Sequence, residues 1–214
     1  MQLTNGKVSR WYDISPNDFV INAPTADRYP TLKENAVNGL PAISFNGSTQ
    51  DLYGGSQILD IGTKGWSYFI IAKCYSNNSP IISKNDRRAT EWNTKPMWWI
   101  DNNRLVLRER GNPIVLSSNA ESHNYQLITS EIYDRSTLTH KIYINSILKN
   151  EMSHNIGSND DIKNTVALRI GRNFISQSGD GVFFNGEIAE IIAFDTIDND
   201  MRNIVHDHWT FLTE

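Results

Sequence analysis

The segment from residue 92 to residue 104 concentrates side chains that can recognise a sugar. It holds three of the six tryptophans of the chain, Trp92, Trp98 and Trp99, and the polar candidates Asp101, Asn102 and Arg104. Aromatic faces stack on the C–H surfaces of sugar rings, while amide, carboxylate and guanidinium groups read hydroxyls. Trp98 and Trp99 are adjacent on an expected strand, so their side chains point to opposite faces. We expect these six residues to bind a ligand. The alternative is that the tryptophans only fill the core, or are covered by a loop, a partner or the C-terminal helix.

The carboxylates of the chain do not form a catalytic pair. A retaining glycosidase needs two carboxyl groups about 5 Å apart. Glu131 and Asp134 are three residues apart, as are Glu187 and Glu190, so each pair lies on opposite faces of a regular strand. No nucleophile-elbow motif is present either. We therefore expect no catalytic residues and no enzyme activity.

Glu190 interrupts an apolar row of an expected strand, formed by Ile188, Ile192 and Phe194. A carboxylate in such a row is costly unless it is paired. Arg169, on an expected neighbouring strand, is the candidate partner. We interpret Glu190 as a structural ion pair or a clamp on loop amides, with a binding role as the alternative.

The sequence contains little that indicates a metal site or a redox-active group. The single Cys74 excludes a disulfide within the chain and a cysteine-based zinc site, and its apolar surroundings predict a buried structural thiol. Two groups of aspartates are candidates for calcium: Asp160 with Asp161, and Asp195 with Asp198 and Asp200. Neither group alternates as a dedicated calcium loop does. We expect no metal site and no cofactor.

Composition and charge exclude further classes of function. The 214 residues carry a formal net charge of −4, which is a poor match for nucleic acid. No run of 18 apolar residues exists, so we expect no membrane insertion. Residues 1–7 lack the apolar core of a secretory signal peptide. The length and the absence of a linker predict a single domain over residues 1–214, with residues 1–9 as an N-terminal arm.

The elements that must position these side chains are mostly strands. Short β-rich runs alternate with turn dipeptides such as Asn-Gly and Gly-Gly, which predicts an all-β, two-sheet antiparallel sandwich. The expected strands cover residues 41–45, 66–74, 80–83, 97–100, 104–108, 114–116, 125–133, 138–144, 166–170 and 181–194.

One helix is expected, over residues 199–212, packed on the sandwich. Asp198, Asn199 and Asp200 supply capping side chains and negative charge at its start. A stripe at three- and four-residue steps then follows: Met201, Ile204, Val205, His208, Trp209 and Leu212. We expect this stripe to be the buried face.

Several segments resemble the laminin-G-like branch of the concanavalin A-like lectin/glucanase superfamily, whose members are jelly rolls. They are the Trp-Tyr-Asp strand at 11–13, Arg28-Tyr29-Pro30, the stretch 38–47, the strand-turn-strand 143–148 with Ser146 in place of glycine, and the closing strands 168–171 and 184–192. The likeness runs from Arg10 to Phe211. It implies a lectin-like sandwich, but its motifs are turns and core strands, which specify fold better than function. The Glu-x-Asp-x-x-Glu pattern of the superfamily's glucanases is absent.

These observations favour a non-catalytic, lectin-like surface module. The fold is typical of outward-facing surfaces, yet the sequence shows no signal peptide and no disulfide. We therefore expect a virus or phage virion protein (fibre, tail or head decoration), which is made in the host cytoplasm and exposed on the virion surface. Its expected partners are a cell-surface glycan, other virion proteins and further copies in a homo-oligomer. The alternatives are a purely structural virion protein, or a carbohydrate-binding module of a larger secreted, extracellular bacterial protein.

Overall fold

The computed structural model describes residues 1–60, 64–77, 79–85, 97–101, 104–109, 112–117, 124–134, 137–153, 165–174 and 181–213. For residues 97–99, 107–109, 112–114, 133, 174 and 210–213, it describes the backbone alone. The strands are β1 (Gln2–Thr4), β2 (Lys7–Tyr12), β3 (Val20–Asn22), β4 (Thr31–Val37), β5 (Leu40–Asn46), β6 (Leu52–Tyr53), β7 (Trp66–Cys74), β8 (Pro80–Lys84), β9 (Met97–Asp101), β10 (Arg104–Glu109), β11 (Asn112–Ser117), β12 (Gln126–Asp134), β13 (Thr139–Ile144), β14 (Ile147–Ser153), β15 (Arg169–Ile170), β16 (Arg172–Phe174), β17 (Gly181–Phe183) and β18 (Asn185–Phe194). The helices are the 3₁₀ turn η1 (Ala26–Arg28) and α1 (Asn199–Thr213).

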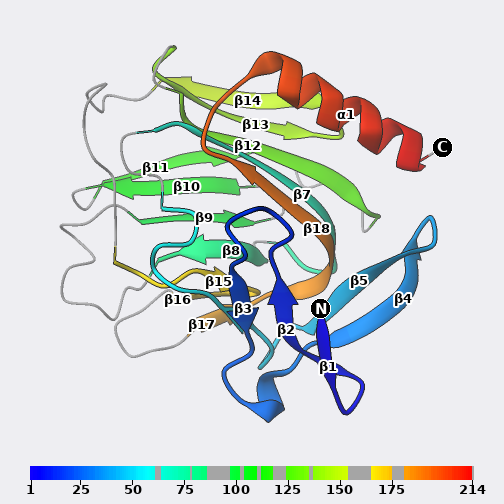
Figure 1. Cartoon of the computed structure of the whole chain (residues 1–214). Coiled ribbons are helices and arrows are strands. Elements are labelled where there is room, and N and C mark those ends of the chain that lie inside the picture. The colour runs from blue at the N-terminus through cyan, green and yellow to red at the C-terminus, as the bar shows by residue number, and fades with distance from the viewer. Residues whose placement is uncertain are drawn as a thin grey trace.

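The strands form one antiparallel ladder that folds back on itself as a sandwich (Figure 1). Its order is β11-β10-β9-β8-β15-β6-β3-β2-β4-β5-β18-β7-β12-β13-β14, with β1 added on β2 and β16 paired with β17. The two halves of the ladder share a core that includes Leu52, Ile82 and Ile170 from one half and Ile70 and Ile128 from the other. The predicted all-β sandwich with one C-terminal helix is confirmed.

β7 shows why an almost wholly apolar strand lies at the centre of one layer. Successive side chains alternate between the faces of a strand. Tyr68 and Ile70 face the core between the layers, while Phe69 and Ile71 pack in a second cluster with Trp209 of α1. Both faces of β7 are therefore dry, and the apolar run 66–74 is explained. Cys74 at its end is a buried thiol outside any disulfide, as predicted, and burial raises its pKa to about 12.

A β-bulge in β18 changes which residues face the core. The pairing of β18 with β7 shifts between Ile188 and Glu190, so Ile188 faces the core between the layers, whereas Ile192 and Phe194 pack on the side of α1. Glu190 lines a small cavity beneath α1 together with Trp209. The prediction of one continuous row from Ile188 to Phe194 was wrong, because periodicity cannot reveal the extra residue.

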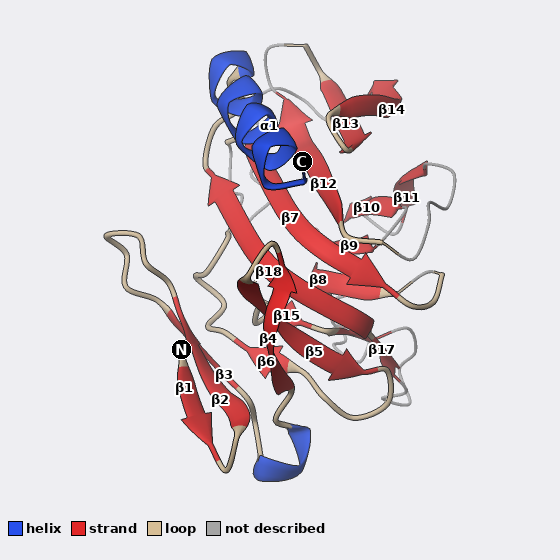
Figure 2. Cartoon of the chain, turned by 90° about the vertical axis from the view of Figure 1, so that its right-hand side faces the viewer, coloured by secondary structure: helices blue, strands red, loops and turns tan. Residues whose placement is uncertain are grey.

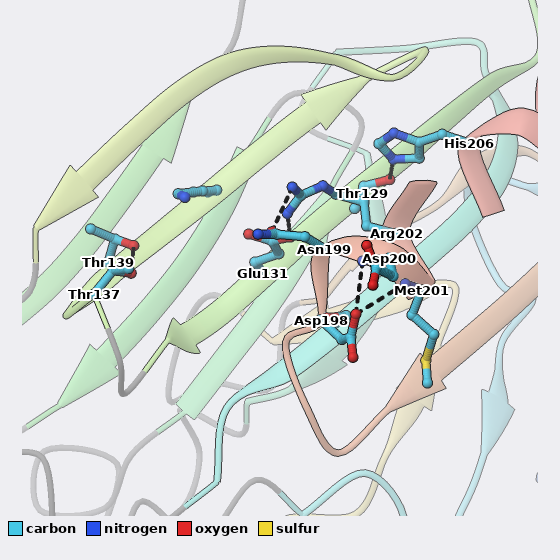
Figure 3. A network of polar contacts seen from close by, with 12 residues as sticks. Thr129, Glu131, Thr137, Thr139, Asp198, Asn199, Asp200, Met201, Arg202 and His206 are labelled. Carbon is cyan, nitrogen blue, oxygen red and sulfur yellow. Dashed lines mark hydrogen bonds and ion pairs between the residues drawn. The ribbon is translucent and has the colours of Figure 1, made fainter. Parts of the chain in front are cut away.

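Helix α1 lies over the outer face of β7 and β12 (Figure 2). Asp198 caps it, with Oδ1 accepting hydrogen bonds from the backbone N–H groups of Asp200 (2.8 Å) and Met201 (3.1 Å), so the predicted start is confirmed (Figure 3). The predicted stripe is only partly right. Trp209 is buried, but Ile204 is 67% exposed. Among the described residues, no helix has the length and apolar character needed to cross a membrane.

Polar contacts explain the rotation of α1 relative to the apolar stripe. Arg202 forms an ion pair with Glu131 of β12, which is 1% exposed, and His206 bonds to Thr129 at 3.0 Å (Figure 3). The docked face therefore runs through residues 202, 205, 206 and 209. A buried carboxylate is costly unless paired, so its cation sets the orientation of α1.

His206 makes the docking of α1 sensitive to pH. Burial, assisted by the positive charge of Arg202 and opposed by Asp207, lowers the pKa of His206 below its usual 6.5. As the pH falls through 6.5, the unfolded chain takes up a proton that the folded protein does not, so this contribution to stability is lost on acidification. We expect the melting temperature to fall less between about pH 7.5 and about pH 5.5 in His206→Gln than in the wild type. His208→Gln, on the exposed side of α1, is the control and should behave as the wild type does. Equal acid sensitivity of His206→Gln and the wild type would contradict this prediction.

Candidate functional site

A cavity of about 560 Å³ opens in the half of the sandwich that does not carry α1. Its wall is formed by β3 and the segment that follows it, η1, β6 with the two glycines after it, and β16. The lining residues are Val20, Asn22, Ala23, Pro24, Arg28, Tyr53, Gly54, Gly55 and Arg172. Its volume lies within the range of small-molecule sites in proteins.

Tyr53 owes its place in the cavity to the alternation of β6. Leu52 faces the core, so Tyr53 is on the outer face, where it pairs in register with Asn22 of β3 and Arg169 of β15. Arg169 Nη2 donates a hydrogen bond to Tyr53 Oη at 2.7 Å, and Arg169 Cζ lies 4.8 Å from the centre of the tyrosine ring. Arg169 Nη1 also donates to the carbonyl of Asn85 at 3.3 Å. Arg169 thus fixes Tyr53, and the prediction that it pairs with Glu190 was wrong.

Two further arginines converge on Phe183 of β17. The guanidinium carbon of Arg172 lies 4.6 Å from the centre of the Phe183 ring, and that of Arg28 lies 5.8 Å from it. β16 pairs with β17 so that Arg172 is opposite Phe183 in register. The Phe183 ring therefore holds both cations at one side of the cavity, where they supply planar hydrogen-bond donors.

A buried carboxylate lies behind these arginines. Asp51 is 0% exposed, and its Oδ2 is 2.5 Å from Nη2 of Arg28. Burial raises the pKa of Asp51, although the charges of Arg28, Arg172 and Arg169 all act to lower it. Three guanidinium groups therefore act on this buried carboxylate from the side of the cavity.

Gly181 leaves room for the guanidinium of Arg172. A Cβ atom at position 181 would lie 2.6 Å from Arg172 Nε. Any side chain at this position would therefore push Arg172 out of its place over Phe183.

A buried lysine holds the turn that forms one wall of the cavity. Lys84 Nζ donates hydrogen bonds to the carbonyls of Ser56 and Ile58, the latter at 3.1 Å, and lies 3.7 Å from Oδ1 of Asp60. Burial lowers the pKa of Lys84 to about 8, against the effect of Asp60. Gly54 and Gly55, which line the cavity, lead into this turn, so Lys84 fixes the wall from behind.

The structure places the predicted tryptophan segment in the same half of the sandwich. Trp92 and Asn102 lie outside the described residues. Trp98 and Trp99 are in β9, where their backbones pair with Lys84 and Ser83 of β8, but their side chains are not among those described. β8 and β15 separate β9 from β6 and the cavity. Ligand binding by this segment stays a prediction.

Asp101 and Arg104 of that segment contact each other. Arg104 donates to Asp101 Oδ2 from Nη2 at 2.9 Å and from Nε at 3.1 Å, and Asp101 is buried. This pair joins the end of β9 to the start of β10. The contact gives Asp101 a structural role whether or not the segment also binds a ligand.

A second polar cluster lies on the outer face of the layer that carries α1. Glu187 of β18 accepts hydrogen bonds from Lys33 (2.8 and 3.0 Å), Tyr75 and Tyr125. These donors lower the pKa of Glu187 against the effect of burial, while burial and the Glu187 carboxylate raise that of Tyr75 to about 12. The prediction that Glu187 and Glu190, and likewise Glu131 and Asp134, lie on opposite faces of a strand was wrong. A β-bulge falls within each pair, so both of its members are opposite residues of one face of the neighbouring strand.

No cluster of three or more His, Cys, Asp or Glu side chains suited to a metal ion occurs within the described part of the chain. Of the calcium candidates, Asp195 forms an ion pair with Lys64, and Asp198 caps α1. Asp160 and Asp161 fall in the undescribed range 154–164.

The strand order defines an antiparallel, jelly-roll-like sandwich with one C-terminal helix, and comparison with solved structures supports that fold. The binding domain of Paraclostridial Mosquitocidal Protein 1 is similar over 97% of this chain and 51% of its own, with 11% identity and a TM-score of 0.61. A structure of botulinum neurotoxin type C, whose cell entry depends on interaction with two ganglioside molecules, is similar over 95% of this chain and 51% of its own, with 16% identity and a TM-score of 0.58. The CBM40 of Ruminococcus gnavus IT-sialidase, bound to α2,3 sialyllactose, matches over 82% of this chain and 97% of its own (15% identity, TM-score 0.54).

This chain spans about half the length of the two toxin chains. No protein family model matches it. No curated protein sequence matches it. At these identities, the solved structures show the fold alone.

The residues of the cavity were not selected from the sequence. Arg28 was noted only as part of a fold motif, and Arg172 directly follows the noted segment 168–171. No sequence motif around Asn22 or Tyr53 indicated a binding site. A useful signal would have been the arginines at 169 and 172, which are close together beside Gly171.

Proposed function

We propose that this protein is a non-catalytic, lectin-like module that binds a glycan in the cavity between β3, β6 and β16. The observation that carries the proposal is the combination of an aromatic ring, an amide and two guanidinium groups around a cavity of about 560 Å³. Rings support the apolar face of a sugar, and the polar groups read its hydroxyls. The neighbours that bind a ganglioside or sialyllactose support the same class of ligand.

Three buried carboxylates support a binding role without catalysis. Glu131 is paired with Arg202, Glu187 is bonded to three donors, and Asp51 is paired with Arg28. Each carboxylate therefore already has a structural partner, in contrast to the two carboxyl groups that face a sugar from both sides in a glycosidase.

We propose a virion surface as the setting, with other virion proteins and further copies of the chain as partners. We also propose that the chain belongs to the laminin-G-like branch of the concanavalin A-like superfamily. The single cysteine leaves the sandwich without an internal disulfide, which suits assembly in a reducing cytoplasm. A weak site also suits a particle, because many copies raise avidity by about 10² to 10⁴. The alternative settings are a purely structural virion protein and a module of a secreted bacterial protein.

Glycan binding is tested by screening the protein, presented multivalently, on a glycan array and then measuring single-site affinity by calorimetry. We expect a Kd in the micromolar-to-millimolar range. Asn22→Ala should weaken binding about three- to tenfold, because one exposed amide that reads a hydroxyl is lost. Asn17→Ala, at an exposed turn outside the cavity, should not change the affinity.

Two results would count against this site. Retention of no glycan would favour the purely structural role. A loss of binding in Trp92→Ala together with an unchanged affinity in Asn22→Ala would move the sugar to the segment 92–104.

A further inference from the structure

We infer that the ligand of the cavity is a sugar with an acetamido group, which binds between the side chains of Asn22 and Tyr53. This inference rests on the proposed glycan-binding function and specifies the class of glycan. The step from sugar to acetamido sugar comes from two neighbouring polar groups on the cavity wall and from the apolar residues beside them.

Asn22 and Tyr53 lie side by side on the cavity wall. They are opposite each other in the antiparallel pairing of β3 with β6, and both line the cavity. Side chains that are directly opposite on one face of a sheet are close enough to contact the same small group. Ile21 packs in the core, so Val20 and Asn22 point to the other face of β3, which is the cavity side. One substituent of a sugar can therefore contact all three residues of this wall.

The hydroxyl proton of Tyr53 is directed away from Arg169. Tyr53 Oη accepts a hydrogen bond from Arg169 Nη2 at 2.7 Å, and a guanidinium group has no acceptor to offer in return. Among the residues that the structure describes, no other group bonds to Tyr53 Oη. The O–H group is therefore available to donate to a ligand, and the bond from the cation makes it a stronger donor. An amide carbonyl oxygen, which accepts and never donates, suits this position.

The side-chain amide of Asn22 supplies the complementary acceptor. The residue is exposed at the rim, and its amide bonds to no other residue in the described part of the chain. Its Oδ1 can accept from the N–H of an acetamido group, while its Nδ2 can donate to a neighbouring sugar hydroxyl. The N–H and C=O of a trans amide point in opposite directions, so one acetamido group can donate to Asn22 and accept from Tyr53 at the same time.

Apolar residues border these two polar groups. Val20 is on the same side of β3 as Asn22, and both line the cavity. Ala23 and Pro24 follow this strand directly and line the cavity as well. They form a surface on which the methyl group of an acetamido substituent would be removed from water. A hydroxyl at the same carbon of the sugar has no methyl group, and its single oxygen must serve both polar partners. The wall therefore favours the acetamido sugar over its hydroxyl analogue.

Tyr53 is held in place before a ligand binds. The guanidinium carbon of Arg169 lies 4.8 Å from the centre of the tyrosine ring, and Arg169 itself is 1% exposed and donates to the carbonyl of Asn85. Because Arg169 covers one face of the ring, a sugar can stack only on the other face. Groups that are already ordered lose little conformational entropy on binding, so their contacts contribute more to affinity. Arg169 is thus a positioning residue for Tyr53.

The first test is the glycan array, on which we expect the retained glycans to carry an acetamido group. Calorimetry then compares matched pairs of methyl glycosides: N-acetylglucosamine with glucose, and N-acetylgalactosamine with galactose. The members of a pair differ only in the substituent at one carbon, so their difference isolates the acetamido group. We expect the acetamido member of at least one pair to bind about tenfold more tightly, from one added hydrogen bond and one buried methyl group.

Variants then locate the acetamido group. Tyr53→Phe keeps the ring over Arg169 and removes the O–H donor, so we expect the preference to fall to about two- to threefold. Tyr75→Phe is the matched control, because it also removes a hydroxyl donor, on the face that carries α1, and should leave the preference unchanged.

The exposed Asn22 gives a second pair of variants that leaves the core intact. Asn22→Asp keeps the acceptor oxygen and should keep the preference for the acetamido sugar, whereas Asn22→Ala should lose it. This pair decides the question if Tyr53→Phe lowers the melting temperature, since that change also takes an acceptor from the buried Arg169.

The outcomes separate this inference from the proposed function. Equal affinities within both pairs of glycosides, or retention on the array of glycans without an acetamido group alone, would overturn the acetamido ligand and leave glycan binding intact. A preference that persists unchanged in both Tyr53→Phe and Asn22→Ala would remove the acetamido group from this wall. Retention of no saccharide at all would overturn the proposed function itself.

Discussion

Replacing Trp209 with alanine is expected to lower the free energy of unfolding by about 3–5 kcal/mol. Trp209 is 4% exposed and packs with Phe69 and Ile71 of β7 and Leu127 of β12. Its removal would leave a large cavity between α1 and the sheet, and the rigid strands cannot close it. Urea denaturation followed by circular dichroism measures the change, with the slope of the transition as a check on two-state behaviour.

Ile204→Ala is the matched control on the same helix. Ile204 is 67% exposed, so its truncation should change stability by less than about 0.5 kcal/mol. A loss below about 1 kcal/mol in Trp209→Ala would show that α1 is only loosely docked on the sandwich.

The existence and the limits of α1 could be predicted from the sequence, because its signals are local. Asp198 accepts from the N–H groups two and three residues ahead, and the apolar spacing extends for the whole helix. Its rotation could not be predicted. The contacts that set it join Arg202 to Glu131 and His206 to Thr129, across more than 70 residues of chain.

The strands also divide into those that local sequence predicts and those that depend on pairing with distant parts of the chain. The run at 66–74 is strongly apolar, and the run at 126–134 is equally long. Both were predicted almost to the residue. Short strands such as β3 and β6 were not predicted, because two or three residues are too few to show an alternation of apolar and polar side chains. The bulge of β18 was missed because it depends on the pairing with β7 rather than on the composition of β18 itself.

The candidate site was the least predictable part of the molecule. The segment 92–104 was chosen because its tryptophans are close together in sequence. The cavity instead combines Asn22, Arg28, Tyr53 and Arg172, which are spread over 150 residues and become neighbours only through the antiparallel pairing of β3 with β6 and the return of the chain at β15 and β16.

Arg202→Met is expected to destabilise the protein by about 2–4 kcal/mol, because it leaves the carboxylate of Glu131 buried without its cation. Glu131 is 1% exposed, and Arg202 also places its guanidinium carbon 5.0 Å from the ring of Tyr143. The lower end of this range allows for the part of Arg202 that reaches solvent. The exposed pair Lys64–Asp195 is the matched control, and Lys64→Met should cost less than about 1 kcal/mol.

A double-mutant cycle separates the ion pair from the packing of the arginine stem. Arg202→Met/Glu131→Leu removes both charges and should recover most of the stability lost in Arg202→Met, with a coupling energy of about 1–3 kcal/mol. If the two losses simply add, the pair contributes no coupling, and the rotation of α1 must come from its apolar contacts. Recovery would instead show that Glu131 is tolerated in β12 because Arg202 neutralises it, and that the loss in Arg202→Met comes from a buried carboxylate left without its cation.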